Sequence, residues 1–345
     1  MQVSGVYIDS IGVHLPEWVS AEKAVVDGIY DADIQAANGL TGTHIAGDVP
    51  AVEMAITAAR NAVERSELEL DEVESHIHSG VFFQGPEGSY PPGYILRELG
   101  VSGASSLDLR LGCNGLLGSL EVAVGQITGA AKAKNVLLTT AENWGTPLLN
   151  RWLGLGPAFI LADGASSVLL SSEGGFAEVR AVKSGVLPEL EQWHRGEDSL
   201  LPPQDLETNP YDLSNRATVF NEKTMSLTDV LEKLTVFNLN IVFGCLVDAG
   251  LNGSDLAKVI AINTDGRMIE QGLMAPLGLG MDRSTWDFGK SVGHMGGSDV
   301  IVSLNHLLES GELAPGDHVL LTSSGPGWTC TAAVITILAK PSWGG

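Results

Sequence analysis

The chain has 345 residues, 44% of them hydrophobic, and its 19 lysine and arginine residues against 42 aspartate and glutamate residues give a formal charge of −23. This length suggests about two domains or one large duplicated domain, and the hydrophobic content is too high for a disordered chain. So few basic residues argue against sequence-independent binding to nucleic acid, which needs its phosphates neutralised, and an anionic membrane surface would repel the charge.

Cysteine use and the lack of targeting signals bear on the compartment. The 3 cysteines are too few for a disulfide framework in a chain of this length, and they fit a reducing cytosol. Residues 1–13 lack the basic and continuous apolar regions of an export signal, and they predict a strand instead. Asn, Asp or Lys interrupts every apolar run before it reaches the roughly 18 residues of a membrane span. We therefore expect a cytoplasmic protein that does not enter a membrane.

Along the chain, short strand-like runs alternate with helical patterns, which favours an α/β fold. Helices are predicted over residues 50–65 and 226–250, where apolar side chains recur at helical spacing. The predicted strands are residues 105–111, 135–140, 158–162, 259–263 and 318–323. Residues 183–216 are rich in proline and acidic residues, and we expect a long surface excursion there, either a tolerated loop or a lid over the substrate.

The sequence also contains an internal duplication. In each half, a short segment before a strand, a glycine-rich turn that opens an apolar helix, and a Val-Leu-Leu-Thr strand follow in the same order. The matching segments are residues 71–75 and 255–259, 112–127 and 293–308, and 136–139 and 319–322. Their nearly constant offset of 183–184 positions predicts a duplicated α/β unit. The expected halves are residues 1–170, which carry the candidate nucleophile described next, and residues 171–345.

Cys113 lies in a turn between Gly112 and Gly115, after a predicted strand and before a predicted helix. The N-terminus of a helix offers unpaired N–H groups and the positive end of the helix dipole, and both favour a thiolate. The flanking glycines let the backbone turn sharply and leave the sulfur open to a substrate. A small buried thiol is the alternative for any cysteine, and it is our interpretation of Cys245 and Cys330. We predict that Cys113 is a nucleophile.

A nucleophilic thiol needs a base, and the matching turn of the second half offers His294. The pseudo-symmetry of the two halves would bring both turns together at the centre of the molecule. We interpret the other histidines as structural or solvated. Because no His, Cys and carboxylate cluster has zinc spacing and no GxGxxG or Walker sequence is present, we expect neither a metal nor a nucleotide cofactor.

Four motifs carry a resemblance to a known family: Ile-Gly-Val-His-Leu-Pro at 11–16, the Gly-Cys-Asn-Gly turn at 112–115, Ala-Asp-Gly-Ala-Ser-Ser-Val-Leu-Leu at 162–170, and Ser-Gly-Glu-Leu-Ala-Pro-Gly-Asp at 310–317. Over nearly its whole length the chain resembles the thiolase superfamily and, within it, β-ketoacyl-ACP synthase III. The resemblance implies a duplicated five-layer α/β/α/β/α thiolase fold, a homodimer, and the nucleophile at Cys113.

Two departures from the family pattern decide the function that we expect. Condensing members carry a His in a His-x-x-Asn segment and an Asn in a later glycine turn, and this pair stabilises the enolate formed when a malonyl unit decarboxylates. Aligned on Arg267, the family His falls at Ile262 and its Asn at Asp265, while His294 stands where the later Asn is expected. Since a hydrophobic side chain cannot donate to an enolate oxygen, the resemblance implies that the decarboxylation machinery is lost.

In its place the resemblance implies a triad. Cys113 attacks a thioester, His294 deprotonates first the thiol and then an incoming hydroxyl, and Asp265 holds the imidazole in the correct tautomer. This set is similar to that of synthase-III-like acyltransferases of antibiotic and polyketide tailoring, the cervimycin malonyltransferase type, one of which transfers intact malonyl units. The implied donor is an acyl-CoA or acyl carrier protein, and the implied acceptor is a hydroxyl of a sugar or another small molecule.

Three alternatives stay open at this point. The chain is a condensing enzyme that primes a polyketide and recruits other donors for the enolate, or an inactive homologue in which Asp265 and His294 have drifted. A third alternative is a non-catalytic subunit that only shapes a dimer interface. Loss of the cysteine would mark such a subunit, and Cys113 is retained.

The oxyanion site is a further departure. The family's second donor is the middle N–H of a Gly-x-Gly turn, here Gly325, Pro326 and Gly327, and proline has no N–H. Either Gly325 or Gly327 donates after a shift of register, or the backbone N–H of Cys113 acts alone.

For the substrate pocket, the resemblance points to two residues. Asn114 follows the nucleophile in its turn, and Tyr90 lies in the 84–94 segment, which resembles the family loop that crosses the dimer and caps the acyl pocket.

Overall fold

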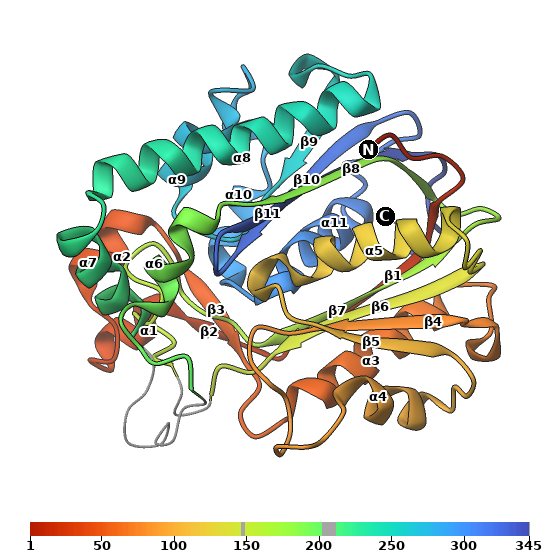
Figure 1. Ribbon diagram of the computed structural model, residues 1–345, viewed down its shortest axis with the longest axis horizontal. Helices are drawn as coiled ribbons and strands as arrows, with labels where there is room; N and C mark the ends of the chain where they lie inside the picture. Colours follow the sequence, from red (N-terminus) through yellow and green to blue (C-terminus); the bar gives the residue numbers. More distant parts are fainter. Residues whose placement is uncertain (146–148, 202–211, 345) are drawn as a thin grey trace.

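Two sets of strands lie one above the other, with helices between them and on both outer faces (Figure 1). The protein is seen here as a computed structural model, which describes residues 1–145, 149–201 and 212–344. Within these residues the main sheet has the order β5 (Ser105–Leu109), β4 (Ser75–Ser79), β6 (Asn135–Glu142), β7 (Gly164–Ser171), β1 (Tyr7–His14), β8 (Ala177–Val186), β11 (Thr329–Ile337), β10 (His318–Gly325) and β9 (Leu256–Ile260).

The two strand sets repeat one topology on either side of a short junction, where Tyr7 of β1 pairs with Glu178 of β8. Outward from the junction, the first set runs β1-β7-β6-β4 and the second runs β8-β11-β10-β9. In each set the first two pairings are antiparallel and the third is parallel. Among the described residues, the first set has one further edge strand, β5, parallel to β4. The predicted division after residue 170 falls just before the end of β7.

Helices form the other layers: α3 (Ala51–Glu64) and α4 (Pro91–Leu99) on the outer face of the first set, α5 (Gly115–Thr128) and α11 (Asp299–Glu309) between the sets, and α8 (Leu227–Ala249) on the outer face of the second (Figure 1). α5 contacts β4 and β6 as well as β8 and β11, and α11 contacts β1 and β7 as well as β9 and β10. The predicted five-layer α/β/α/β/α fold is confirmed.

Shorter elements complete the chain, and several of them gather at one end of the molecule, at the left in Figure 1. They are α1 (Ala21–Val26), α2 (Ala32–Asn38), α6 (Glu191–Arg195), α7 (Leu213–Lys223), α9 (Gly266–Ile269), α10 (Trp286–Val292), the hairpin strands β2 (Glu17–Ser20) and β3 (Gly42–Ile45), the 3-10 turns η1 (Leu70–Glu72), η2 (Gly112–Asn114), η3 (Pro188–Leu190), η4 (Gly253–Asp255), η6 (Met281–Arg283) and η7 (Gly296–Ser298), and the π-helical turn η5 (Glu270–Met274).

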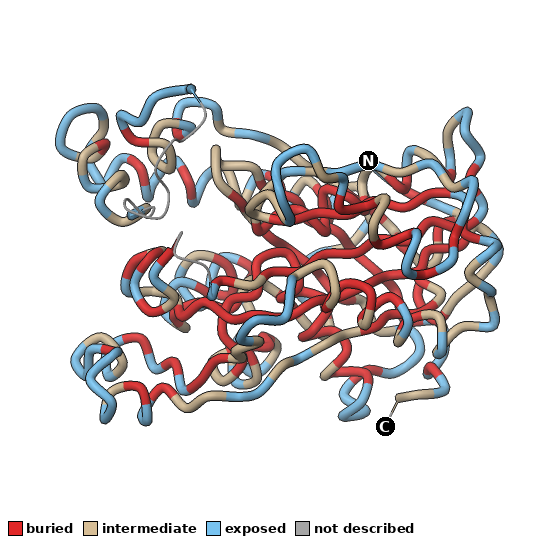
Figure 2. Tube along the Cα trace, turned by 90° about the horizontal axis from the view of Figure 1, so that it is seen from below, coloured by how far each residue is buried: buried red, intermediate tan, exposed pale blue. Residues whose placement is uncertain are grey.

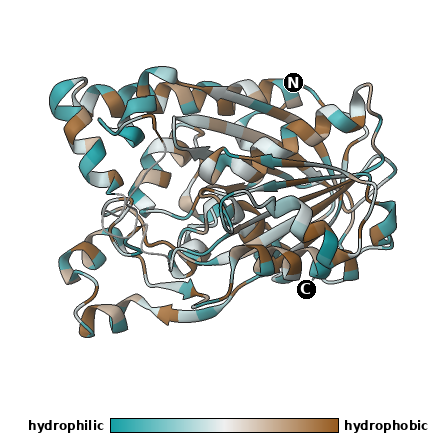
Figure 3. Ribbon diagram, turned by 60° about the horizontal axis from the view of Figure 1, so that its bottom comes forward, coloured by the Kyte–Doolittle hydropathy of each residue, from teal (hydrophilic) through white to brown (hydrophobic). Residues whose placement is uncertain are grey.

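Burial explains the sequence pattern of the central elements. Every residue of β6 and β7 is buried, because helices cover both faces of the first strand set. Buried residues concentrate in the strand layers and the helices between them (Figure 2), and hydrophobic residues follow the same layers (Figure 3). A glycine in β1 allows a close approach of α3 to the sheet, since a Cβ at Gly12 would lie 2.0 Å from the carbonyl oxygen of Ala58 in α3.

Two of the predictions about secondary structure are wrong. Residues 158–162 do not form a strand: Leu161 makes one isolated bridge to His294, and the segment is apolar because it packs against that turn. Residues 183–216 are not simply a loop, because β8 continues to Val186 and η3, α6 and the start of α7 follow. Residues 202–211 of this excursion lie outside the described residues.

By length and hydropathy alone, α8 is apolar enough to cross a membrane. Its buried residues, among them Ile241, Val242 and Cys245, face β8 and β11. One face of α8 therefore packs on the sheet, while other apolar residues of the helix, such as Val236 and Val247, are exposed.

Candidate active site

Cys113 lies in η2, between the edge strand β5 and the helix α5. Gly112 precedes it with a φ of 57°, a left-handed conformation that favours glycine. A Cβ at Gly112 would also lie 2.2 Å from Cδ of Pro326, so the ring of this proline fills the space beside the turn. The Cys113 carbonyl accepts a hydrogen bond from Ser323 Oγ at 2.7 Å. The turn is therefore held from the β10–β11 side as well as by its own helix.

The two predicted turns do meet, because Cys113 Sγ lies 3.0 Å from His294 Nε2. On the other side of the imidazole, His294 Nδ1 lies 2.5 Å from Asp299 Oδ2. A thiol in contact with a ring nitrogen, whose second nitrogen is held by a carboxylate, is the arrangement of a nucleophile, a base and an orienting acid.

Asp299 is the first residue of α11 and is fully buried. Its Oδ1 accepts from the backbone N–H of Met295 at 2.6 Å, and its Oδ2 accepts from the backbone N–H of Asn263 at 2.7 Å. These two bonds fix the carboxylate while it holds Nδ1 of His294. Sequence reasoning missed Asp299, although an acidic residue that opens a helix five positions after the predicted base was the available signal.

Asp265, the predicted orienting acid, is not at the imidazole. It is the N-cap of α9, where its side chain accepts from the backbone N–H of Arg267 at 2.9 Å and pairs with the Arg267 guanidinium. Burial raises the pKa of Asp265, but the bonds from Arg267 outweigh this effect and lower the pKa below its ordinary value. The prediction is corrected: Asp299 occupies the orienting position, because Asp265 is engaged in capping its own helix.

His294 is nearly inaccessible, with 1% of its surface exposed. Its backbone N–H donates to Ile160 at 2.7 Å, and its ring lies 5.2 Å from that of Phe159. Burial alone would lower the pKa of His294, but the adjacent Asp299 and Cys113 raise it well above its ordinary value. A raised imidazole pKa beside a thiol favours transfer of the thiol proton to the ring.

The matches to known proteins cover both turns of this site. The family model of 3-oxoacyl-[acyl-carrier-protein] synthase III matches residues 107–185, and the model of its C-terminal part matches residues 246–337. The solved structure of the acyltransferase ChlB3 is 37% identical, over 98% of this chain and 99% of that one, with a TM-score of 0.92. The chain belongs to the synthase III-like acyltransferases of the thiolase superfamily.

More distant similarities extend to synthase III proteins. The acyltransferase is 26% identical to β-ketoacyl-[acyl-carrier-protein] synthase III 3 of Streptomyces coelicolor over 313 residues, which cover 89% of each chain. The synthase III structure from Aquifex aeolicus shares the fold, with a TM-score of 0.79 and 20% identity over 96% of this chain and 99% of that one.

The oxyanion candidates of the acyltransferase differ in position. A Cβ at Gly325 would lie 2.1 Å from the carbonyl oxygen of Leu111 and 3.1 Å from the backbone nitrogen of Asn114, so Gly325 packs directly on the Cys113 turn. At Gly327, which has a φ of 76°, a Cβ would meet nothing within 4 Å. Among the predicted donors, Gly325 and Cys113 therefore lie together, whereas Gly327 lies further along the turn. Which N–H donates stays a prediction.

The two predicted pocket residues have different surroundings. Asn114 is buried next to the nucleophile, and its Oδ1 has no hydrogen-bond partner among the described residues, which leaves an acceptor beside Cys113. Tyr90 is half exposed, and its hydroxyl donates to the carbonyl of Ser106 in the edge strand β5. Within one chain Tyr90 is thus a surface residue, and its place near a pocket stays a prediction.

The other two cysteines differ from Cys113. Burial raises the pKa of Cys245 and of Cys330 to about 12 each, which disfavours the thiolate. The Cys245 thiol is engaged by the carbonyl of Ala332 at 3.3 Å. Within the described parts of the chain, no group of three or more His, Cys, Asp or Glu side chains is placed to hold a metal.

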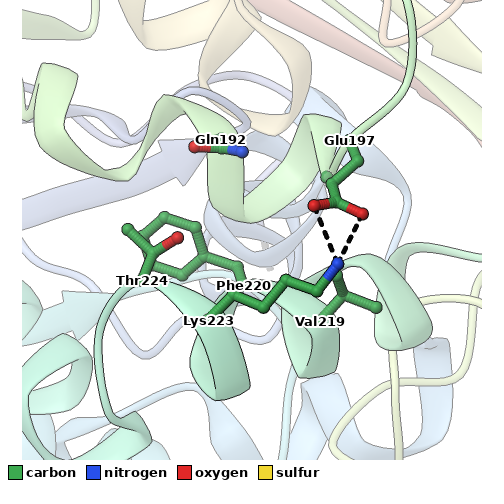
Figure 4. Close-up of a pocket in the computed structure, with 7 residues that line it drawn as sticks. Gln192, Glu197, Val219, Phe220, Lys223 and Thr224 are labelled. Carbon is green, nitrogen blue, oxygen red and sulfur yellow. Dashed lines mark hydrogen bonds and ion pairs between the residues drawn. The ribbon is translucent and has the colours of Figure 1, made fainter.

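A hollow between α6 and α7 lies in the surface excursion (Figure 4). Lys223 reaches across it to both carboxylate oxygens of Glu197, at 2.9 and 2.8 Å, and Phe220 forms part of its wall. Its volume of about 10 Å³ is the space that about one water molecule needs. This hollow is too small for an acyl donor or an acceptor.

Proposed function

We propose that the enzyme transfers an acyl group from a CoA or carrier-protein thioester through Cys113 to a hydroxyl group of a sugar or another small natural product. The observation that carries this proposal is the 3.0 Å contact between Cys113 Sγ and His294 Nε2, with Asp299 on the opposite ring nitrogen. Retention of a thiol with a base argues against a non-catalytic subunit and against an inactive homologue.

In the first half-reaction, the Cys113 proton moves to His294 Nε2 and the thiolate attacks the carbonyl carbon of the donor thioester. The carbon–sulfur bond of the donor then breaks, and the departing thiolate takes the proton from the imidazolium and leaves as a thiol. The acyl group is left as a thioester on Cys113. The backbone N–H of Cys113, with Gly325 or Gly327, would stabilise the oxyanion of the tetrahedral intermediate.

In the second half-reaction, the acceptor hydroxyl gives its proton to His294 Nε2 and its oxygen attacks the acyl carbon. The bond to Cys113 Sγ breaks, and the sulfur recovers the proton from the imidazolium. Asp299 holds the ring so that Nε2 faces the sulfur in both steps.

Two residues favour transfer over decarboxylative condensation. Ile262 is hydrophobic and cannot donate a hydrogen bond to an enolate, and His294 is engaged by Asp299 as a base. A malonyl group would therefore be moved intact.

Incubation with malonyl-CoA followed by intact-protein mass spectrometry tests this reaction. We expect a stable malonyl adduct on Cys113 and no carbon dioxide, with no adduct on the Cys113→Ala protein. An acetyl adduct or released carbon dioxide would instead identify a condensing enzyme. Loaded protein is then offered glycosides with free hydroxyls, and an ester product identifies the acceptor class.

We further propose that the enzyme is a cytoplasmic homodimer. In the described chain β5 pairs with β4 on one side only, and Leu107 in its middle is 41% exposed. An unpaired strand edge with an apolar side chain favours pairing with a second copy. Light scattering measures the mass of the particle, and a 36.2 kDa particle at all concentrations would exclude the dimer.

A further inference from the structure

Glu142 is a buried carboxyl group next to the site that the steps above do not use. It is the last residue of β6, with 3% of its surface exposed, and its Oε1 accepts from the backbone N–H of Val81 at 2.5 Å. A Cβ at Gly296, two residues after His294, would lie 2.9 Å from Glu142 Cγ. The carboxyl group is therefore enclosed between the segment after β4 and the turn that carries the base.

The charged groups that face Glu142 come from two elements. The turn before α11 contributes His294, which is held by Asp299, and the segment before β7 contributes Asp163. Asp163 already pairs with both terminal nitrogens of Arg151, at 3.0 and 2.8 Å. Among the described residues, no lysine or arginine pairs with Glu142.

This environment favours the uncharged form of the carboxyl group. Burial raises the pKa of Glu142 to about 8, against the opposing effects of the Val81 N–H and of His294, and Asp163 raises it further. A second carboxylate beside the imidazole would stabilise the imidazolium. A stabilised imidazolium keeps a larger share of His294 protonated at a given pH, so less of the neutral imidazole is available to take the proton of the acceptor hydroxyl.

We propose that Glu142 is a positioning residue that acts through His294: as a neutral carboxylic acid it leaves the imidazole free to take a proton, and when it ionises in alkaline solution it holds more of that imidazole in the protonated form. The inference rests on the proposed function, because it concerns the same cysteine and histidine. It assigns Glu142 an influence on how the deacylation rate responds to alkaline pH.

p-Nitrophenyl acetate serves as the probe, so that the natural donor need not be known. Attack by the Cys113 thiolate releases one equivalent of p-nitrophenolate and leaves acetyl-Cys113. Water then gives a proton to His294 and attacks the thioester, which releases acetate and restores the thiol. The burst measures acylation, and the later steady rate measures the base in deacylation.

Glu142→Gln keeps an oxygen for the Val81 N–H and removes the charge. We expect the pH profile of its deacylation rate to shift to lower pH than that of the wild type. The ratio of the two rates should then rise between pH 7 and 9, towards about tenfold if the charge moves the pKa of His294 by about one unit. Glu173→Gln, at an exposed carboxylate paired with Lys134, is the matched control and should follow the wild-type profile.

Difference infrared spectroscopy supplies a second measurement that does not depend on turnover. A carbonyl band of a protonated carboxyl group should be present near neutral pH in the wild type and missing in Glu142→Gln. A rate ratio that stays constant with pH, or a wild type without this band, overturns the role of Glu142. If the wild type gives no burst at all, the proposed function fails instead.

Discussion

The two glycine-rich turns that meet at the site, residues 112–115 and 293–298, stand at corresponding points of the two strand sets but contribute different amounts of chemistry. The first passes directly from η2 into α5 and contributes one reactive atom, Cys113 Sγ. The second is longer, with a bridge at His294 and the turn η7 before α11 begins, and it contributes both the base and Asp299. Because His294 and Asp299 belong to the same half, the contact of Cys113 Sγ with His294 Nε2 is the one contact among these three side chains that crosses between the halves.

The largest expected effect is at the first turn. Cys113→Ala should abolish covalent acyl loading, because neither of the other two described thiols contacts a base as Cys113 contacts His294. Cys245→Ala and Cys330→Ala should load as the wild type does, since burial disfavours their thiolates. Mass spectrometry of the intact proteins measures this, and an adduct on Cys113→Ala would remove the nucleophile from the first turn.

Substitutions of His294 and of Asp299 should both lower turnover, and their effects should not add. His294→Ala should remove most turnover, and Asp299→Asn should cost up to about 10⁴-fold by analogy with serine triads, because the amide favours the wrong tautomer. The double variant should cost scarcely more than His294→Ala alone. Turnover rates of the three variants measure this coupling.

Asp265→Asn is the matched control for Asp299→Asn. Asparagine is also a good N-cap, so α9 keeps its cap and we expect turnover close to that of the wild type. A loss as large as that of Asp299→Asn would return the orienting role to Asp265.

A smaller effect is expected where the first turn touches the strands of the second half. Gly112→Ala forces a side chain into a left-handed conformation and against Pro326, and it should lower the free energy of unfolding by about 1–3 kcal/mol. Gly125→Ala, in α5 with nothing near the added Cβ, should raise it by about 0.5–1 kcal/mol. Urea unfolding compares them, and equal stabilities would show that the contact with Pro326 imposes no constraint.

Strand β4, which corresponds to β9 of the second set, supplies a test that depends on pH. β4 carries His76, which is buried and bonded to Thr139, and burial together with His78 lowers its pKa from 6.5 to about 3. Below pH 6.5 the unfolded chain binds a proton that the folded chain does not, so stability should fall by about 1.4 kcal/mol per pH unit from this group. His76→Gln should flatten the dependence of unfolding on pH between 6.5 and 4, and an unchanged slope would contradict this origin.

Much of the fold followed from local patterns in the sequence. The helical spacing at 50–65 and 226–250 agrees with α3 and α8 to within a residue or so at each end, and the five-layer arrangement is confirmed. Apolar content misled at 158–162, because those side chains pack on the His294 turn and their backbone does not join the sheet. Periodicity reports burial, and burial alone does not distinguish a strand from the lining of a site.

The site was only half accessible to the same reasoning. The glycines around Cys113, at the start of a predicted helix, indicate its turn. The duplication then predicts His294 in the matching turn. The position of the Asp299 carboxylate depends on hydrogen bonds from the backbone N–H groups of Asn263 and Met295. Asn263 follows β9, far from Asp299 in the sequence, so no local pattern predicts this bond. Asp265 was chosen from its spacing to Arg267, and in the structure that spacing is the signature of a helix cap.

The bond from Ser323 to the Cys113 carbonyl and the contact of Pro326 with Gly112 give the site an order of assembly during translation. Cys113 leaves the ribosome long before His294, Ser323 and Pro326, the residues that contact its turn. A nascent chain that ends before His294 carries an ordinary thiol with no base. The contact between Cys113 and His294 can therefore form only late in synthesis, after the first half has had time to fold.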